Sequence, residues 1–220
     1  MYFSDRMTLG DKLADSMATL HGKDAILVCL KPSSMMVAVA MAVKLRAWVL
    51  PLFYEDIVNP LDPTSLLGAL TQKGEFCLNP ALTENDYEYV VQEYMGQLEE
   101  EKREALSRLN SKINGYYGSS DPYVLNNRPV VLVGDVMFNA LSLEVAKSLL
   151  KPLQPAAVYG VAGNATIDVS DKFRVATNES FILDVLPSSV LGEDHYFENH
   201  DAYSEEEKHA LATNIAQYWA

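Results

Sequence analysis

VVLVGDVMFNALS, residues 130–142, carries the strongest structural signal in the chain. Its first four residues, Val130–Val133, form a continuous apolar run that is typical of a parallel strand buried on both faces. A single acid, Asp135, follows, and Ser142 stands where the N-cap of the next helix is expected. A buried strand that leads through a short loop to a helix N-terminus favours a ligand site, because the free backbone N–H groups of the helix attract anions.

Five short apolar runs are separated by segments of helix length, and each run has the character of a strand. They are Ala25–Leu30, Trp48–Tyr54, Val130–Val133, Ala156–Ala162 and Phe181–Leu186. Strands that alternate with helices predict an α/β fold, a doubly wound, mostly parallel sheet with flanking helices. Val130–Val133 is expected inside this sheet and not at its edge.

The segment between the second and third runs has a different character. Glu55–Asn79 is rich in proline and glycine and predicts a loop followed by short hairpin strands. Helical spacing then extends from Thr83 to about Leu109, and Asn114–Asn127 is a polar loop. We therefore expect a single domain, residues 1–220, with a hood at about residues 55–127 and a C-terminal helix at about residues 204–219.

The chain is acidic, with a formal net charge of −13 and a sequence pI near 4.6. Binders of nucleic acids and of anionic membranes need a basic surface, so this charge argues against both partners. Two cysteines, Cys29 and Cys77, are too few for a disulfide framework, and no metal site is expected. No apolar run reaches the roughly 18 residues that span a bilayer, and the start lacks a signal-peptide core, which together predict a cytoplasmic protein.

Several motifs resemble those of bacterial type I phosphoribosyltransferase-like proteins, in the same order along the chain. They are Phe3-Ser4-Asp5-Arg6, Leu30–Ala38, Asn59–Pro63, and Tyr196-Phe197 followed by Ser204–Glu207. The chain is therefore identified as a divergent member of this family, and the resemblance implies the same α/β fold. It also implies the family's reaction, the transfer of a phosphoribosyl group from phosphoribosyl pyrophosphate (PRPP) to a base. Mg²⁺ would then be bound only together with PRPP.

The resemblance also assigns roles to residues at the ends of the first and third strands. Asp135 corresponds to the one remaining acid of a pair that contacts the ribose, and it is the candidate catalytic residue. The candidate substrate- and phosphate-binding residues are Asn139, Ala140, Leu141, Ser142, Lys31, Ser33 and Ser34. We expect the loops that hold these residues to converge with Glu55–Pro60 on one cleft at the carboxyl ends of the strands.

Several replacements argue against the prediction that the chain is an active phosphoribosyltransferase. Gly134 stands in place of the first acid, and Phe138 puts bulk into a turn where close approach to a phosphate favours small residues. Pro32 replaces an arginine, and Glu55 and Asp56 replace an Arg-Lys pair of the pyrophosphate site. A charge pair about 4 Å apart contributes roughly 4 kcal/mol at an effective dielectric of about 20, so tight PRPP binding is not expected.

Two functions remain open. The chain is either a PRPP-dependent transferase with altered contacts, or a catalytically silent protein that binds a different phosphate- or nucleotide-like ligand or a protein partner, a second copy included. The replacements favour the silent protein. The surviving residues also have purely structural interpretations, with Ser142, Ser33 and Ser34 as helix caps and Asp135 as an acceptor for loop amides. His195 and His200 lie near acids but are a weak basis for a metal site.

Overall fold

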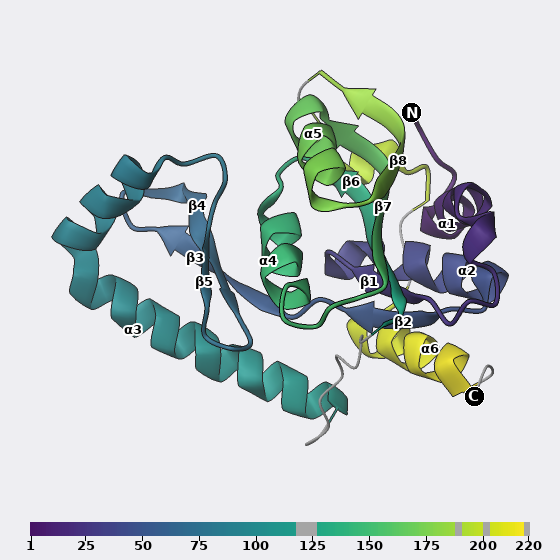
Figure 1. Cartoon of the computed structure of the whole chain (residues 1–220). Helices are drawn as coiled ribbons and strands as arrows, with labels where there is room; N and C mark the ends of the chain where they lie inside the picture. Colours follow the sequence, from purple (N-terminus) through teal and green to yellow (C-terminus); the bar gives the residue numbers. More distant parts are fainter. Residues whose placement is uncertain (118–126, 188–190, 200–202, 218–220) are drawn as a thin grey trace. The chain divides into compact units, whose positions relative to one another are not determined.

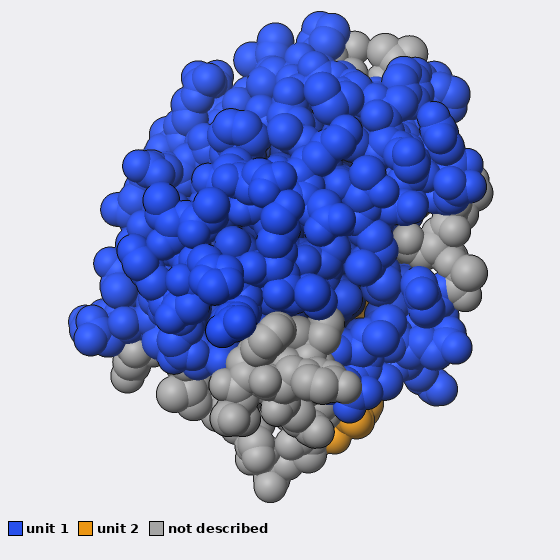
Figure 2. All heavy atoms as spheres, turned by 90° about the vertical axis from the view of Figure 1, so that its right-hand side faces the viewer, with its two compact units in different colours: residues 1–52, 123–139, 153–220 blue, residues 53–122, 140–152 orange. Residues whose placement is uncertain are grey.

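The computed structural model describes residues 1–117, 127–187, 191–199 and 203–217, and these residues form two compact units (Figure 2). The first unit contains Met1–Leu52, Tyr123–Asn139 and Leu153–Ala220, and the second contains Phe53–Pro122 and Ala140–Pro152. The second unit therefore begins close to the start of the expected hood, and it also takes in the helix that follows Asn139. In the described ranges, no helix combines the length and the apolar character needed to cross a membrane.

A five-stranded, fully parallel sheet forms the centre of the first unit (Figure 1). Its order is β2 (Trp48–Pro51), β1 (Ile26–Cys29), β6 (Pro129–Met137), β7 (Ala157–Thr166) and β8 (Glu179–Leu186). All five predicted strands are present, and Val130–Val133 lies in the central strand with no side chain exposed. The predicted doubly wound α/β architecture is confirmed.

Helices cover both faces of this sheet. On one face, α1 (Arg6–Ser16) and α2 (Met35–Leu45) pack together, and a Cβ at Gly163 of β7 would meet Leu9 of α1. On the other face lies α5 (Ile167–Ala176), where a Cβ at Gly160 would meet Phe173. Glycine at both positions of β7 therefore lets helices approach the sheet closely from opposite sides. The sequence predicted a segment of helix length between β7 and β8 but no range for α5.

Near residues 130–142, the end of one strand and the start of the next helix differ from the predicted positions. β6 continues through Asp135 to Met137, because Val136 and Met137 are buried and pair with β7. The next helix, α4 (Leu141–Leu150), begins before Ser142, since the Ala140 carbonyl already accepts the helical bond from the Glu144 N–H at 3.0 Å. The expected N-cap at Ser142 is therefore wrong. Ala140 is the N-cap, and Ser142 lies inside the first turn.

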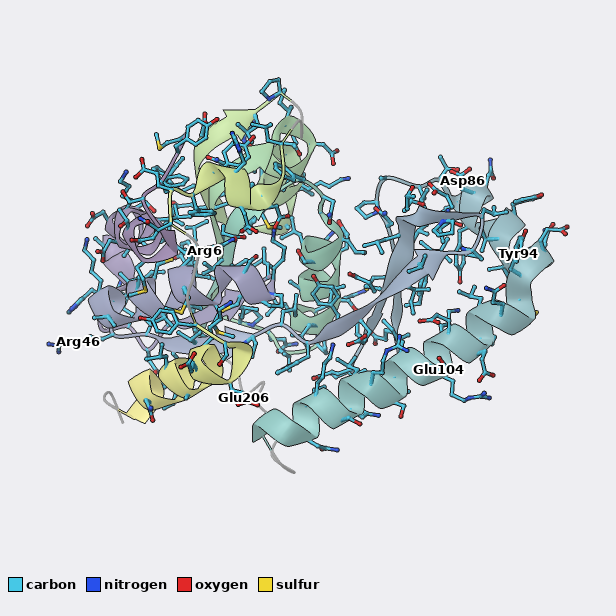
Figure 3. All side chains as sticks on the ribbon, turned by 180° about the vertical axis from the view of Figure 1, so that it is seen from behind. Arg6, Arg46, Asp86, Tyr94, Glu104 and Glu206 are labelled. Atoms are coloured by element: carbon cyan, nitrogen blue, oxygen red, sulfur yellow. The ribbon has the colours of Figure 1, made fainter. Side chains whose placement is uncertain are left out.

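The second unit is built around a three-stranded antiparallel sheet, β3 (Tyr54–Asn59), β4 (Asp62–Thr71) and β5 (Phe76–Leu78). The predicted hairpin strands are present, but the chain enters β3 directly where a loop was expected. The long helix α3 (Glu84–Tyr117) packs on β3 and β4, and α4 packs on β4 and β5. Non-helical backbone angles at Tyr94, labelled in Figure 3, divide α3 into two arms.

The ends of several predicted strands and helices differ by a few residues from those in the structure. The run Trp48–Tyr54 is divided between two strands, since β2 ends at Pro51 and β3 begins at Tyr54. α3 extends beyond Leu109, so the start of the predicted polar loop is helical, while residues 118–126 lie outside the described residues.

The C-terminal segment contains the short 3₁₀ helix η3 (Glu193–Tyr196) and the helix α6 (Glu205–Gln217), which packs against α2 and β2. Ser204 and Glu207 form the predicted capping box. The Glu207 N–H donates to Ser204 Oγ at 3.2 Å, and the Ser204 N–H donates to Glu207 Oε2 at 2.8 Å.

Candidate functional site

The candidate site of the first unit lies at the carboxyl ends of β1 and β6. The chain leaves β1 toward β2 on one side and later returns as β6 on the other, so the direction of winding switches between these two strands. Ligands of open α/β sheets bind outside the carboxyl ends of the strands at such a switch. Residues Lys31–Ser34 follow β1, and Asp135 is near the end of β6.

Asp135 is at the centre of a buried group of charges, and its side chain is 0% exposed. Arg6 Nε donates to Asp135 Oδ2 at 3.0 Å, and Ser33 Oγ donates to Asp135 Oδ1 at 3.2 Å. Lys31 Nζ lies 3.4 Å from the same Oδ1 atom. The structure therefore brings two of the predicted binding residues, Lys31 and Ser33, onto the predicted catalytic acid, and it adds Arg6 from the first turn of α1, labelled in Figure 3.

Asp135 is held as a carboxylate. Burial alone would raise its pKa, but the positive charges of Lys31 and Arg6, with hydrogen bonds from Arg6 and from the Val136 N–H, lower the pKa below its ordinary value. The acid is therefore ionised at neutral pH, and its oxygens accept hydrogen bonds from the chain itself.

Two further acids, both on η3, pair with the same cations from the outside. Arg6 Nη2 lies 2.8 Å from Asp194 Oδ1, and Lys31 Nζ lies 2.7 Å from Glu193 Oε2. Lys31 also donates to the carbonyl of Val136. The Asp135 cluster, by which we mean Asp135, Arg6, Lys31, Glu193 and Asp194, thus holds two cations against three carboxylates.

Ser34 has a structural role in the turn after β1. Its hydroxyl donates to the Lys31 carbonyl at 2.7 Å and accepts from the Lys31 N–H at 3.2 Å. These bonds close the 3₁₀ turn η2 (Pro32–Ser34) directly before α2. Ser34 is buried, and its hydroxyl closes this turn, but among the described residues it makes no side-chain capping bond to α2, so the predicted cap of that helix is wrong.

The predicted phosphate turn follows β6. Asn139 is exposed, whereas Ala140, Leu141 and Ser142 are buried. The Ser142 hydroxyl lies in the first turn of α4 and has no hydrogen-bond partner among the residues that the structure describes. Ala140–Ser142 and Glu55–Pro60 belong to the second unit, so the convergence of all three loops on one cleft stays a prediction.

The two acids that replace the basic pair lie on β3 of the second unit. Glu55 forms ion pairs with two cations of α3, with Arg108 Nε 3.3 Å from its Oε2 and with Lys112 at its Oε1. Asp56 is exposed on the same strand. Within this unit, Glu55 therefore joins the sheet to α3.

Sequence reasoning missed three members of the Asp135 cluster. The sequence predicts Arg6 only as part of a fold motif, and it predicts no role for Glu193 or Asp194. The available signal for Arg6 was its place directly after the helix cap Asp5, in the first turn of α1. Among the described residues, no group of three His, Cys, Asp or Glu side chains is arranged to hold a metal ion, and His200 lies outside these residues.

Comparison with known proteins gives a fold and no family. No family model matches the chain, and no curated protein matches it. The crystal structure of TT1426 from Thermus thermophilus is similar at a TM-score of 0.70 and 21% identity, over 98% of this chain and 100% of that chain. This similarity shows a shared fold along the whole chain.

Hypoxanthine phosphoribosyltransferases are similar at a lower level. The enzyme from Trypanosoma cruzi, in a variant with ternary substrates, aligns at a TM-score of 0.47 and 13% identity, over 94% of this chain and 90% of that chain. The enzyme from Staphylococcus aureus aligns at a TM-score of 0.45 and 11% identity, over 86% and 78%. Scores at this level support no statement about function.

Proposed function

We propose that this chain has a phosphoribosyltransferase-like fold without the PRPP-dependent reaction, and that it acts as a non-catalytic ligand-binding or regulatory protein. The observation that carries the proposal is the state of Asp135, which is fully buried and paired with Arg6 and Lys31. The ligand class that the resemblance implies, a small phosphate- or nucleotide-like molecule, stays part of the proposal.

A catalytic acid that contacts ribose must offer its oxygens to the ribose hydroxyls. In this chain, the Asp135 oxygens accept hydrogen bonds from Arg6 and Ser33 and lie next to the Lys31 ammonium group. Freeing the carboxylate from its buried partners costs about 3–5 kcal/mol. Since micromolar binding corresponds to about 8 kcal/mol, this cost would leave about 3–5 kcal/mol, which is binding in the millimolar range.

The residues present do not fit Mg²⁺ bound together with PRPP. Magnesium sites use carboxylate oxygens that can reach a hydrated metal ion, together with substrate phosphates. Asp135 has no exposed surface, and it is surrounded by two cations that would repel the metal. We therefore assign no catalytic step to Mg²⁺ in this chain.

Isothermal titration calorimetry of the full chain with PRPP and Mg²⁺ tests the proposal. We expect no binding below about the millimolar range, a standard free energy no better than about −4 kcal/mol. Micromolar binding that is abolished by Asp135→Asn but kept by the control Asp168→Asn would overturn the proposal. The control acid is 71% exposed and pairs with Lys172 on α5.

One observation supports the alternative, a transferase with altered contacts. Ser142 is buried in the first turn of α4 with its hydroxyl unpaired among the described residues. A hydroxyl at a helix N-terminus is suited to a phosphate group. If micromolar PRPP binding is found, Ser142→Ala should weaken it, whereas an unchanged affinity would leave this alternative without its main support.

A further inference from the structure

The two edges of the parallel sheet differ in how they are protected. At one edge, β2 is only four residues long, ends at Pro51 and packs against α6. At the other edge, β8 is eight residues long and contains no proline, lysine or arginine. Among the described residues, β8 packs mainly on β7, α5 and α1, and the two helices lie on opposite faces of the sheet (Figure 1). Short strands, proline, lysine and covering helices are the usual means of blocking an edge, so β8 is able to accept another strand.

One face of β8 presents apolar side chains beside this edge. Phe181, Leu183 and Val185 alternate along the strand, so their side chains point to the same face of the sheet. Leu183 packs on the core of the first unit, whereas Phe181 is 43% exposed and Val185 is 44% exposed. The two exposed side chains lie two positions before and two positions after Leu183. An antiparallel copy of the strand, related by a two-fold axis through Leu183, would therefore place Phe181 opposite Val185 twice.

The same register keeps the acids of β8 apart. The matched pairs extend from Ser180 to Leu186, and Asp184 is then opposite Ile182 of the second copy. Glu179, the other acid of the strand, lies outside these pairs. Like charges directly opposite each other destabilise strand pairing, and this register contains none.

The helix beside this edge is complementary to itself in charge. α5 leads from the end of β7 to the start of β8, so it runs alongside β8 in the opposite direction and packs on both strands. Its first half carries Asp168 and Asp171, and its second half carries Lys172 and Arg174. The two-fold axis makes the second α5 antiparallel to the first. The acidic half of each helix therefore lies on the side of the basic half of the other, which favours a second copy as the partner.

We propose that β8 is a dimerisation edge, and that a second copy of this chain pairs with it in antiparallel fashion about Leu183. The five parallel strands of each copy then form one continuous sheet. A two-fold interface needs a surface that is complementary to itself, and β8 with α5 meets this requirement in its apolar pattern and its charges. The outward backbone N–H and C=O groups of β8 supply the hydrogen bonds, and the side-chain pairs set the register. This inference goes beyond the proposed function, because it needs neither the Asp135 cluster nor a ligand.

Sedimentation equilibrium of the full chain at about 100 µM tests the dimer, because the weaker interfaces of standard size bind in the micromolar range. We expect twice the chain mass of 24.4 kDa. Val185→Lys should raise the Kd of the dimer at least about tenfold, since it removes both Phe181–Val185 pairs and places a lysine on each edge. The matched control is Val43→Lys on α2, where Val43 is 55% exposed and the helix packs on β1 and β2, away from β8. A monomeric chain would leave this edge to a different protein and overturns the proposal. Equal weakening by the control, or a dimer that Val185→Lys leaves unchanged, overturns it as well.

Cysteine cross-linking tests the register of the two strands. Opposite residues of antiparallel strands have Cα atoms about 4.5–5.5 Å apart, which is within reach of a disulfide. A mixture of Phe181→Cys chains and Val185→Cys chains should therefore form a disulfide-linked mixed dimer on oxidation. Both variants carry Cys77→Ala, because Cys77 is half-buried, whereas Cys29 is buried. Neither variant alone should cross-link, because each new cysteine and its own symmetry mate are four positions apart along the strands, about 13 Å. A disulfide in either variant alone, or none in the mixture, overturns the proposal.

Discussion

Each unit of the molecule holds a carboxylate between two cations, and the two arrangements differ in how far water reaches them. In the first unit, Asp135 lies between Arg6 and Lys31, with all three side chains largely buried. In the second unit, Glu55 lies between Arg108 and Lys112, whose side chains are 45% and 59% exposed. The same pairing chemistry is therefore placed in two different dielectric environments.

This difference decides what each pairing can do. A buried pair is expensive to break, because either partner left alone is a charge without water or counter-charge. An exposed pair is exchanged for water at little cost. Asp135 is thus fixed as a part of the fold, while Glu55, whose own side chain is 12% exposed, pairs with cations that water reaches.

The largest effect is expected from Asp135→Ala. The substitution removes the buried acid between Arg6 and Lys31, which keep their more exposed partners Asp194 and Glu193, and should lower the free energy of unfolding by up to about 3–5 kcal/mol. Urea unfolding followed by circular dichroism measures the loss, with Asp168→Ala as an exposed control. A loss below about 1 kcal/mol would mean that the cluster is no more important to stability than a surface pair.

The pH dependence of stability should also distinguish Asp135 from an exposed acid. The pKa of Asp135 is lowered in the folded protein, since Lys31 and Arg6 outweigh the effect of burial. Its contribution should therefore be complete above its ordinary value of 3.8 and be lost as the pH falls toward the lower value of the folded state. The difference in unfolding free energy between the unchanged chain and Asp135→Asn should be constant near pH 7 and shrink below about pH 4. A difference that grows in acid would contradict the lowered pKa.

The fold was predictable because its signals are local. Continuous apolar runs identify central parallel strands, which are buried on both faces, and Val130–Val133 is the clearest example. The range of the helix α5 was not predicted because its pattern is weak. Only Val169, Ser170 and Phe173 are buried, while the apolar Ile167 and Val175 are exposed, so apolar residues do not mark one face.

The site was only partly predictable, because its contacts join distant parts of the chain. Arg6 and Asp135 are 129 positions apart, and Arg6 and Asp194 are 188 apart. Nothing in the local sequence states which acid an arginine will meet. The cap at Ser142 was misplaced although serine is a good local capping residue, because the helical bond from the Glu144 N–H already ends on the Ala140 carbonyl and Ser142 is buried in the first turn.

A smaller effect is expected from Glu55→Gln. The variant loses the ion pairs with Arg108 and Lys112, but both cations are well exposed, so the loss should be about 0.2–1 kcal/mol. The loss of stability should be smaller still in about 1 M salt, because the Debye length there is about 3 Å. Urea unfolding at low and high salt measures both quantities. A loss as large as that of Asp135→Ala would remove the contrast between the two units.

The smallest effect, and the one with the opposite sign, is expected from Asp56→Asn. Partial loss of hydration, and next the neighbouring charge of Glu55, raise the pKa of Asp56 despite the opposing effect of Lys112. A raised carboxyl pKa means that the folded state binds the proton more tightly, so stability falls as the pH rises through and above the ordinary value of 3.8. Removing the charge should therefore stabilise the protein at pH 7, by only a few tenths of a kcal/mol because the side chain is exposed, and should have no such effect at about pH 3. Thermal unfolding of both proteins at the two pH values checks the sign. A loss of stability at pH 7 would show that Asp56 is paired as Asp135 is, and the two units would then use their acids in the same way.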